Sequence, residues 1–235
     1  MSDHGANTPG RPHAVVFLDG EYSDPAWHRA LATDADILVA ADGGGAFLFA
    51  LHVTPHAVVG DFDSLDDEAF VAFDEGGVDM LRHPVRKDVT DGELAVDEAL
   101  RRGAARVTLV GATGALDHTL GHLAILRGLE ARGVVARLAA PNLAVTVLTA
   151  PADVTLGASA GVRVSLAPIG ADATVSLSGL DYPLDHGLLS ATACLGLGNH
   201  VTTSHGARIV VHGGSVVALV GWGAEQFAGA LRPTA

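Results

Sequence analysis

The chain has a single cysteine, no long apolar run and no apolar leader, and each absence excludes a class of protein. Cys194 alone cannot form an internal disulfide or a cysteine-based zinc site, so we expect it to be a small buried apolar residue. No uncharged apolar run approaches the ~18 residues of a membrane span. The segment Met1–Pro12 lacks the apolar core of a signal peptide. It is therefore expected to be a frayed tail, and the protein to be cytoplasmic.

Basic residues are also scarce: 14 Lys and Arg stand against 27 Asp and Glu, which gives a formal net charge of −13. A nucleic acid needs a basic surface, so the composition argues against nucleic acid as a partner. A field of this sign would repel ATP unless a bound metal ion neutralised it locally. It would suit a cationic co-substrate, and the alternative is that the charge serves only solubility.

Short β-rich runs alternate with helical stretches over residues 14–148. The runs predicted as strands are Ala14–Leu18, Ile37–Ala41, Ala57–Gly60, Val78–Arg82, Arg106–Gly111 and Val134–Ala139. The stretches predicted as helices are Pro25–Ala32, Ala46–Leu51, Asp67–Asp74, Asp91–Arg102 and Asp117–Arg132. This alternation predicts βαβ units around a mainly parallel sheet that is buried on both faces.

After Pro151 the pattern changes to short strands separated by glycine-rich turns. The predicted strands are Val154–Leu156, Val162–Leu166, Thr174–Leu177, His200–Thr203, Arg208–His212 and Ser215–Val220. They predict a small antiparallel sandwich, in which residues 212–215 form a hairpin turn. We therefore predict two domains, residues 13–149 and 151–228, with the boundary near Thr149-Ala150-Pro151.

Two acidic runs follow predicted strands of the first domain. They are Gly60-Asp61-Phe62-Asp63-Ser64 and Lys87-Asp88-Val89-Thr90-Asp91. Open α/β sheets bind ligands at the carboxyl ends of their strands, and clustered carboxylates there need a cation between them. Mg²⁺ is the first candidate, because it prefers oxygen ligands and accompanies phosphate. The runs therefore predict metal-assisted phosphate chemistry.

The first run is also open to a structural interpretation. In an extended segment, Asp61 and Asp63 would point to the same side and could chelate one ion together. Alternatively, Asp63-Ser64 caps the helix that begins near Asp66.

Helix starts place further candidate residues at the same sheet edge. Thr90 and Glu93 form a predicted capping box, which puts Asp91 at a helix amino terminus where anions are favoured. The run Asp42-Gly43-Gly44-Gly45 follows the second strand, and taken alone it is more typical of a tight strand–helix turn than of a phosphate loop. Asp117 opens a later helix. Favourable interaction with the helix dipole would explain an aspartate at this position as well as a role in binding would.

His118 and His122 lie four apart on one predicted helix face, as zinc ligands do. No third ligand lies nearby in the sequence, so a zinc site is disfavoured.

Together these motifs resemble the thiamine pyrophosphokinase family. The matching segments are Asp42-Gly43-Gly44, Gly60–Ser64, Lys87–Asp91, Gly111–Gly114 with Asp117-His118, and Gly179–Leu184. The resemblance implies a Rossmann-like α/β domain followed by a β-sandwich, and a homodimer with active sites between subunits. It also implies an ATP-dependent pyrophosphotransferase that uses Mg²⁺, converts thiamine to thiamine diphosphate and releases AMP.

The resemblance also assigns roles to individual residues. The residues implied to hold Mg²⁺ with the triphosphate are Asp61, Asp63 and Asp91. With Asp88, these three are the implied catalytic residues. The residues implied to bind ATP are Asp42, Gly43, Gly44, Lys87, Thr90 and Gly114. Asp117 and Asn199 are implied to bind substrate.

The chain departs from the family pattern in two places. The usual Gly-Gly-Arg-x-Asp-His is shortened to Gly114-Ala115-Leu116-Asp117-His118 and lacks the arginine, and the usual Ser-Asn pair is Gly198-Asn199. Two alternatives therefore stay open: a pyrophosphokinase for another hydroxyalkyl heterocycle such as a pterin, and a non-catalytic nucleotide-binding regulator. A haloacid-dehalogenase-type phosphatase is discounted, because that class carries Asp-x-Asp after its first strand.

Overall fold

The computed structural model describes residues 11–83, 89–158, 160–204, 206–221 and 232–233. The chain divides into two compact units, one reaching to Ala140 and the other beginning at Pro141. The division lies one strand earlier than the boundary expected near Thr149-Ala150-Pro151. Most of the tail expected at Met1–Pro12 falls outside the described residues. Within the described ranges, every helix is too short or too polar to cross a membrane.

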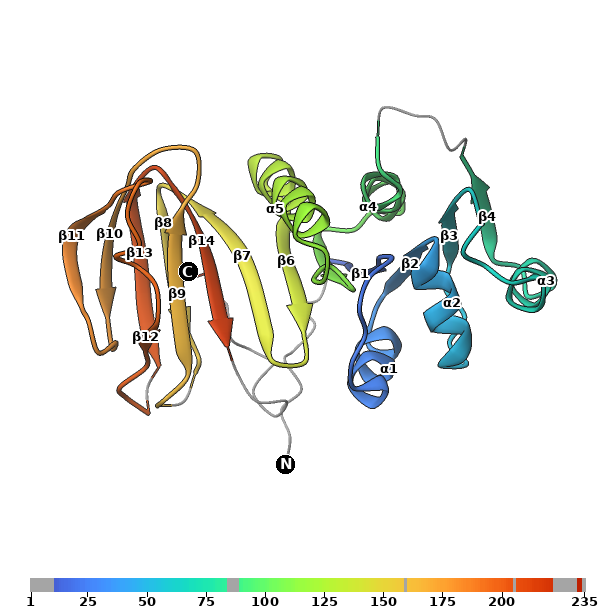
Figure 1. Ribbon diagram of the computed structural model, residues 1–235, viewed down its shortest axis with the longest axis horizontal. Helices are drawn as coiled ribbons and strands as arrows, with labels where there is room; N and C mark the ends of the chain where they lie inside the picture. Colours follow the sequence, from blue (N-terminus) through green and yellow to red (C-terminus); the bar gives the residue numbers. More distant parts are fainter. Residues whose placement is uncertain (1–10, 84–88, 159, 205, 222–231, 234–235) are drawn as a thin grey trace. The chain divides into compact units, whose positions relative to one another are not determined.

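The first unit alternates strands and helices. Its elements are β1 (His13–Phe17), α1 (Pro25–Thr33), β2 (Ile37–Ala41), α2 (Gly43–Ala50), β3 (Ala57–Gly60), α3 (Asp67–Glu75), β4 (Asp79–Arg82), α4 (Asp91–Arg101), β5 (Arg106–Val110), α5 (Leu116–Ala131) and β6 (Val135–Ala140). The strands pair in parallel in the order β6-β5-β1-β2-β3-β4. Helices α4 and α5 lie on one side of this sheet, and α1 and α2 lie on the other (Figure 1). The predicted parallel α/β architecture is confirmed.

Burial explains why the central strands were recognisable in the sequence. Every residue of β1, β2 and β3 is buried, as expected for parallel strands covered by helices on both faces. The edge strand β4 is partly exposed. Helix α2 begins at Gly43, three residues before the predicted start at Ala46, so the glycine run forms the first helical turn.

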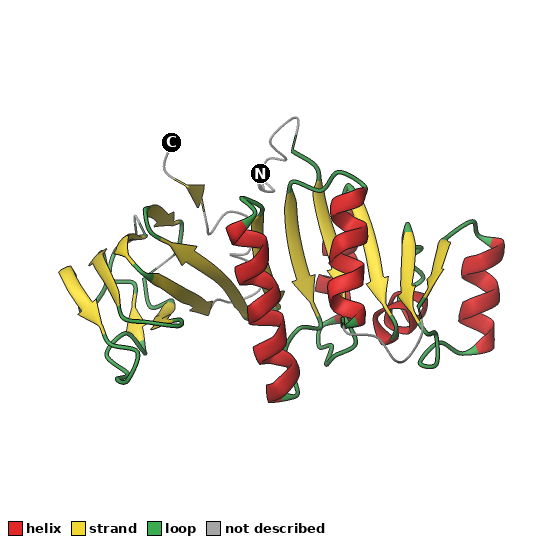
Figure 2. Cartoon of the chain, turned by 90° about the horizontal axis from the view of Figure 1, so that it is seen from above, coloured by secondary structure: helices red, strands yellow, loops and turns green. Residues whose placement is uncertain are grey.

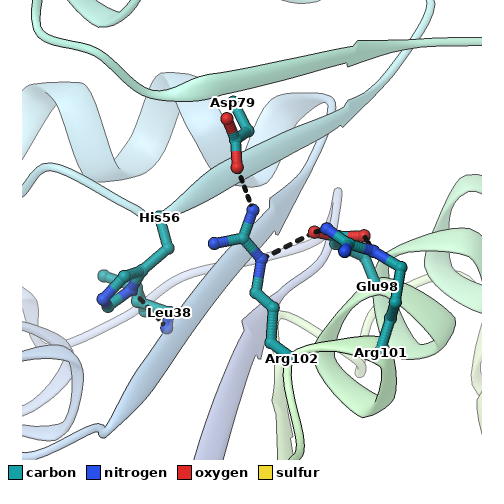
Figure 3. Close-up of polar contacts among 6 residues, drawn as sticks. All are labelled: Leu38, His56, Asp79, Glu98, Arg101 and Arg102. Carbon is teal, nitrogen blue, oxygen red and sulfur yellow. Dashed lines mark hydrogen bonds and ion pairs between the residues drawn. The ribbon is translucent and has the colours of Figure 1, made fainter.

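An ion-pair network attaches the end of α4 to the edge of the sheet (Figure 3). Glu98 is buried and accepts hydrogen bonds from Arg101 Nε at 2.7 Å and Arg102 Nε at 2.6 Å. Arg102 also pairs with Asp79 on β4. These arginines, Arg101 first, lower the pKa of Glu98 although burial opposes them. The network holds one end of α4 in place, and the other end carries Asp91.

In the described residues the second unit contains only strands and loops (Figure 2). Its strands are β7 (Leu143–Thr149), β8 (Ala152–Leu156), β9 (Arg163–Pro168), β10 (Ala173–Ser178), β11 (Leu184–Leu189), β12 (Asn199–His200), β13 (Ala207–Gly213), β14 (Ser215–Gly221) and β15 (Arg232–Pro233). They pair antiparallel in two sets, in the orders β12-β9-β14-β7 and β11-β10-β13-β8-β15. Side chains of both sets, such as Val216 and Ile209, share one apolar core.

Three expectations for the second unit are wrong. Strands β13 and β14 belong to different sheets, so residues 212–215 form a corner between sheets and no hairpin. Gly214 makes this corner with φ +76°, and a Cβ there would lie 2.6 Å from the Asp172 carbonyl oxygen. The strand expected at His200–Thr203 is the two-residue β12. Cys194 is exposed, because it lies in a series of turns on the surface between β11 and β12.

Candidate functional site

The candidate site lies where β1, β2 and β3 of the first unit end. Asp42 follows β2 with an unusual backbone conformation, φ 37° and ψ −109°. Its Oδ1 accepts a hydrogen bond from the Phe62 N–H at 3.4 Å. A Cβ on Gly60 would overlap this carboxyl group, so glycine is required there. The close packing turns the Asp42 carboxyl toward the loop that follows β3.

The charges of two other carboxyl groups act on Asp42. Burial raises the pKa of Asp42 to about 6, and the charge of Asp91 is the next largest contribution. The charge of Asp61 raises it further, whereas the Phe62 N–H opposes the shift. Asp42 is therefore influenced by the charges of Asp61, in the loop after β3, and of Asp91, at the start of α4. Such like-charged groups favour a cation between them.

Asp63 behaves differently from Asp61. Its side chain is exposed and its Oδ1 accepts from Ser64 Oγ at 3.1 Å, while its N–H donates to Asp61 Oδ1 at 3.0 Å. The expected extended segment is wrong, because Phe62 adopts φ +70°. The capping alternative is also wrong, because Asp66 caps α3 by accepting from the Ala69 N–H at 2.8 Å.

The start of α4 matches the predicted capping box. Thr90 Oγ1 accepts from the Glu93 N–H at 3.2 Å, and Glu93 Oε2 accepts from the Thr90 N–H at 2.8 Å. The Thr90 hydroxyl also donates to Glu93 at 3.0 Å, so it serves the helix start. Asp91 is the first residue of the helix, where backbone N–H groups favour negative charge. Lys87 and Asp88, assigned to the same loop, lie outside the described residues.

Asp19 is a further carboxylate at this edge, which the sequence reasoning missed. A Cβ on Gly43 would overlap the Asp19 carboxyl, and a Cβ on Gly44 would overlap the Phe17 carbonyl group. The two glycines therefore let the start of α2 pack closely against the end of β1. A signal was present, because Asp19 follows an apolar strand just as Asp42 and Asp61 do.

The loop after β5 packs against the loop after β1. Gly111 and Gly114 adopt φ +69° and +140°, and a Cβ on Gly20 would overlap the Gly111 carbonyl oxygen. Tyr22 donates its hydroxyl to the Leu18 carbonyl oxygen and stacks on Phe47 at 3.8 Å between ring centroids. Burial raises the pKa of Tyr22, and the charge of Asp19 adds to the shift. The hydroxyl therefore stays protonated and donates within the loop that follows β1.

The first turn of α5 exposes Asp117, whose Oδ1 accepts from the His118 N–H at 2.9 Å. The rings of His118 and His122 are 6.3 Å apart between centroids. Among the residues described, no three His, Cys, Asp or Glu side chains form a group that could by itself hold a metal ion.

Asn199 lies in the second unit and is 6% exposed. Its Oδ1 accepts from the N–H groups of Tyr182 and His200, each at 3.0 Å, and its Nδ2 donates to the Tyr182 carbonyl oxygen at 2.9 Å. The amide thus holds the backbone of Tyr182, whose side chain is exposed. Any contribution to substrate binding from this amide would act through Tyr182.

These features define an α/β protein with an acidic site at the carboxyl ends of its parallel strands. Residues 28–136, all in the first unit, match the family model described as thiamin pyrophosphokinase, catalytic domain. The thiamine pyrophosphokinase of Bacillus subtilis is 26% identical over 162 residues, which cover 67% of this chain and 75% of that protein. The comparisons confirm the resemblance that the motifs indicate: the chain is similar to thiamine pyrophosphokinases.

Solved structures show the same fold. The B. subtilis thiamine pyrophosphokinase structure superimposes with a TM-score of 0.77 at 20% identity, covering 89% of this chain and 98% of that chain. Yeast thiamin pyrophosphokinase gives a TM-score of 0.79 at 12% identity, covering 94% of this chain and 90% of that chain. At these identities the likeness describes the fold alone.

Proposed function

We propose that the chain is a thiamine pyrophosphokinase, which transfers pyrophosphate from ATP to the hydroxyl group of thiamine and yields thiamine diphosphate and AMP with Mg²⁺. The observation that carries this proposal is that the charges of Asp91, at the start of α4, and of Asp61, after β3, both act on Asp42, after β2. All three lie within the segment that matches the family's catalytic domain.

The residues present fit Mg²⁺. Burial raises the pKa of Asp42, and the charges of Asp91 and Asp61 add to the shift. Added positive charge would therefore stabilise this edge, and its carboxylate ligands are all oxygens. Asp42 joins the predicted ligands Asp61, Asp63 and Asp91 as a residue that would hold the ion. Mg²⁺ in such sites uses one or two carboxylates together with phosphate oxygens, so ATP would supply part of the coordination. When bound, the ion would neutralise charge on the triphosphate.

The reaction needs positioning more than covalent help from the protein. The thiamine hydroxyl oxygen forms a bond to the β-phosphorus, the bond from that phosphorus to the bridging oxygen of the α-phosphate breaks, and AMP leaves. Gly43, Gly44 and Gly114 would bring backbone close to the nucleotide, and Lys87 and Thr90 would complete its site. Holding both reactants in line supplies a large part of such a rate enhancement. Asp88 would line the same site, Asp117 would seat substrate, and no general base is assigned.

Residues 151–228 are proposed to bind the acceptor and to form a homodimer, with residues 13–149 as the catalytic domain. Support comes from exposed apolar side chains of the second unit. They are Tyr182, Leu188, Leu195 and Leu197. Pairing through strands β13 or β14 is excluded, because each already has a strand on both sides, and Trp222 lies outside the described residues. Sedimentation and activity on dilution test this, since a fully active monomer would contradict the shared site.

An assay of AMP release tests the proposed reaction. Wild-type protein with ATP and Mg²⁺ should release AMP when thiamine is present and not without it. Asp42→Asn should lose most of this activity, whereas Asp74→Asn, an exposed change on α3, should keep it. AMP release with a hydroxymethyl pterin but not with thiamine would show the other acceptor class. ATP binding without AMP release would show a regulator.

A further inference from the structure

The side chain of His122 binds the loop that follows β5. Its Nδ1 lies 2.9 Å from the Ala112 carbonyl oxygen, ten residues earlier in the chain. A carbonyl oxygen can only accept, so Nδ1 carries the proton and donates. Burial lowers the pKa of His122 and His118 adds to this, against the opposing effect of the Ala112 hydrogen bond.

The loop needs such a support, because its own sequence does little to fix it. Gly111 and Gly114 adopt positive φ angles, and Ala115 precedes α5 without any side-chain cap. Small residues of this kind allow many backbone conformations in the absence of tertiary contacts. A donor fixed on the second turn of α5 selects one of them.

The loop that His122 contacts also packs against the loop that carries Asp19. Ala112 follows Gly111, whose carbonyl oxygen is pressed against Gly20, and Gly20 follows Asp19. One turn further along α5, Ile125 lies against the start of α4, where a Cβ on Gly92 would be 3.7 Å from Ile125 Cδ1. Helix α5 therefore borders both the β1 loop and the segment that carries Asp91.

We propose that His122 is a positioning residue for the nucleotide: its Nδ1–H holds the Gly111–Gly114 loop in the conformation that receives the phosphates of ATP. This rests on the proposed function, because that function makes the loop part of the ATP site. The ring acts through the loop and does not touch the reacting atoms.

Two substitutions separate the hydrogen bond from the packing of the ring. In His122→Asn the amide nitrogen is attached to Cγ, as Nδ1 is, so the donor is kept. His122→Leu fills a similar space without a donor. We expect the Leu variant to weaken ATP binding about tenfold, the effect of losing one hydrogen bond of ordinary net strength. The Kd for ATP of the Asn variant should stay within about twofold of the wild-type value. The same is expected of His118→Leu, which alters the exposed neighbour of His122.

Calorimetric titration with ATP and Mg²⁺, in the absence of thiamine, gives the Kd of each variant, and circular dichroism checks that each is folded. Equal Kd values for wild type and His122→Leu would overturn the proposal. Equally weakened Asn and Leu variants would overturn it as well, because packing alone would then explain the effect. The AMP assay on wild type is an independent test. If the variants show the expected Kd values for ATP but wild type releases no AMP, the proposed reaction is wrong and the role of His122 in ATP binding is still supported.

Discussion

Lowering the pH from 7.5 to 5 should destabilise the protein through one buried imidazole at the start of β1. His13 is 8% exposed, and its Nε2 lies 2.8 Å from Thr108 Oγ1, which also accepts from Arg137 Nε at 3.0 Å. Burial lowers the pKa of His13 from 6.5 to about 4. The charges of Arg137 and Arg106 add to this shift, whereas Asp36 opposes it.

The sign and size of the effect follow from this shift. In the unfolded chain His13 binds a proton near pH 6.5, whereas in the folded protein it does so only near pH 4. Between these values the unfolded state binds more protons, so the free energy of unfolding falls as the pH falls below 6.5. One pKa unit corresponds to about 1.4 kcal/mol, which gives a loss of about 2 kcal/mol at pH 5 and about 3 kcal/mol once the pH is below 4.

Urea unfolding of wild type and His13→Gln at pH 7.5 and pH 5 measures this contribution. Glutamine keeps a polar group toward Thr108 but does not titrate. The loss of stability between the two pH values should be about 2 kcal/mol smaller in the variant than in wild type. At pH 7.5 the imidazole is neutral in the folded and the unfolded state, so the difference in stability between wild type and variant at this pH reports packing alone. Equal losses in the two proteins would refute the reasoning.

Three further substitutions test other contacts. Gly60→Ala should lower Tm and abolish ATP binding, because its Cβ would displace the Asp42 carboxyl. Gly77→Ala is the control for backbone strain, since Gly77 also has a positive φ but has open space around it. Equal changes of Tm and of ATP binding in the two variants, measured by calorimetry, would contradict the reasoning. Asn199→Ala should cost about 2–3 kcal/mol in urea unfolding, since buried backbone groups lose their partners, and a loss below about 0.5 kcal/mol would count against this. Glu98→Gln should cost about 1–3 kcal/mol by the same measurement, and unchanged stability would argue against the buried ion pairs.

Much of the first unit could be predicted, because its elements are specified locally. The runs Ile37–Ala41 and Ala57–Gly60 are continuously apolar and bounded by polar or turn residues, and both strands have these bounds in the structure. The capping box at Thr90 likewise depends on residues three apart. Since strand ends meet at one edge of a parallel sheet, the approach of Asp61 and Asp91 to a common group followed from the order of elements.

The departures depend on tertiary contacts. Gly43 and Gly44 are needed at the start of α2 because Asp19 and Phe17, distant in sequence, pack where their side chains would otherwise stand. The positive φ of Phe62, which lies between Asp61 and Asp63, carries no sequence signal, because such a conformation is uncommon for a bulky residue. The Gly213-Gly214 pair is equally compatible with a hairpin and with a corner, and only the pairing of the flanking strands decides between them.

That corner has a consequence for the synthesis of the protein. Strands β13 and β14 each have a partner strand on both sides, in two different sheets, and they come later in the chain than β7 to β12. While a ribosome is still adding residues 207–221, the earlier strands of both sheets lack the neighbour that joins them. A nascent chain therefore has to keep β7 to β12 from pairing wrongly until residues 207–221 emerge, and a premature stop before residue 207 removes the middle of both sheets at once.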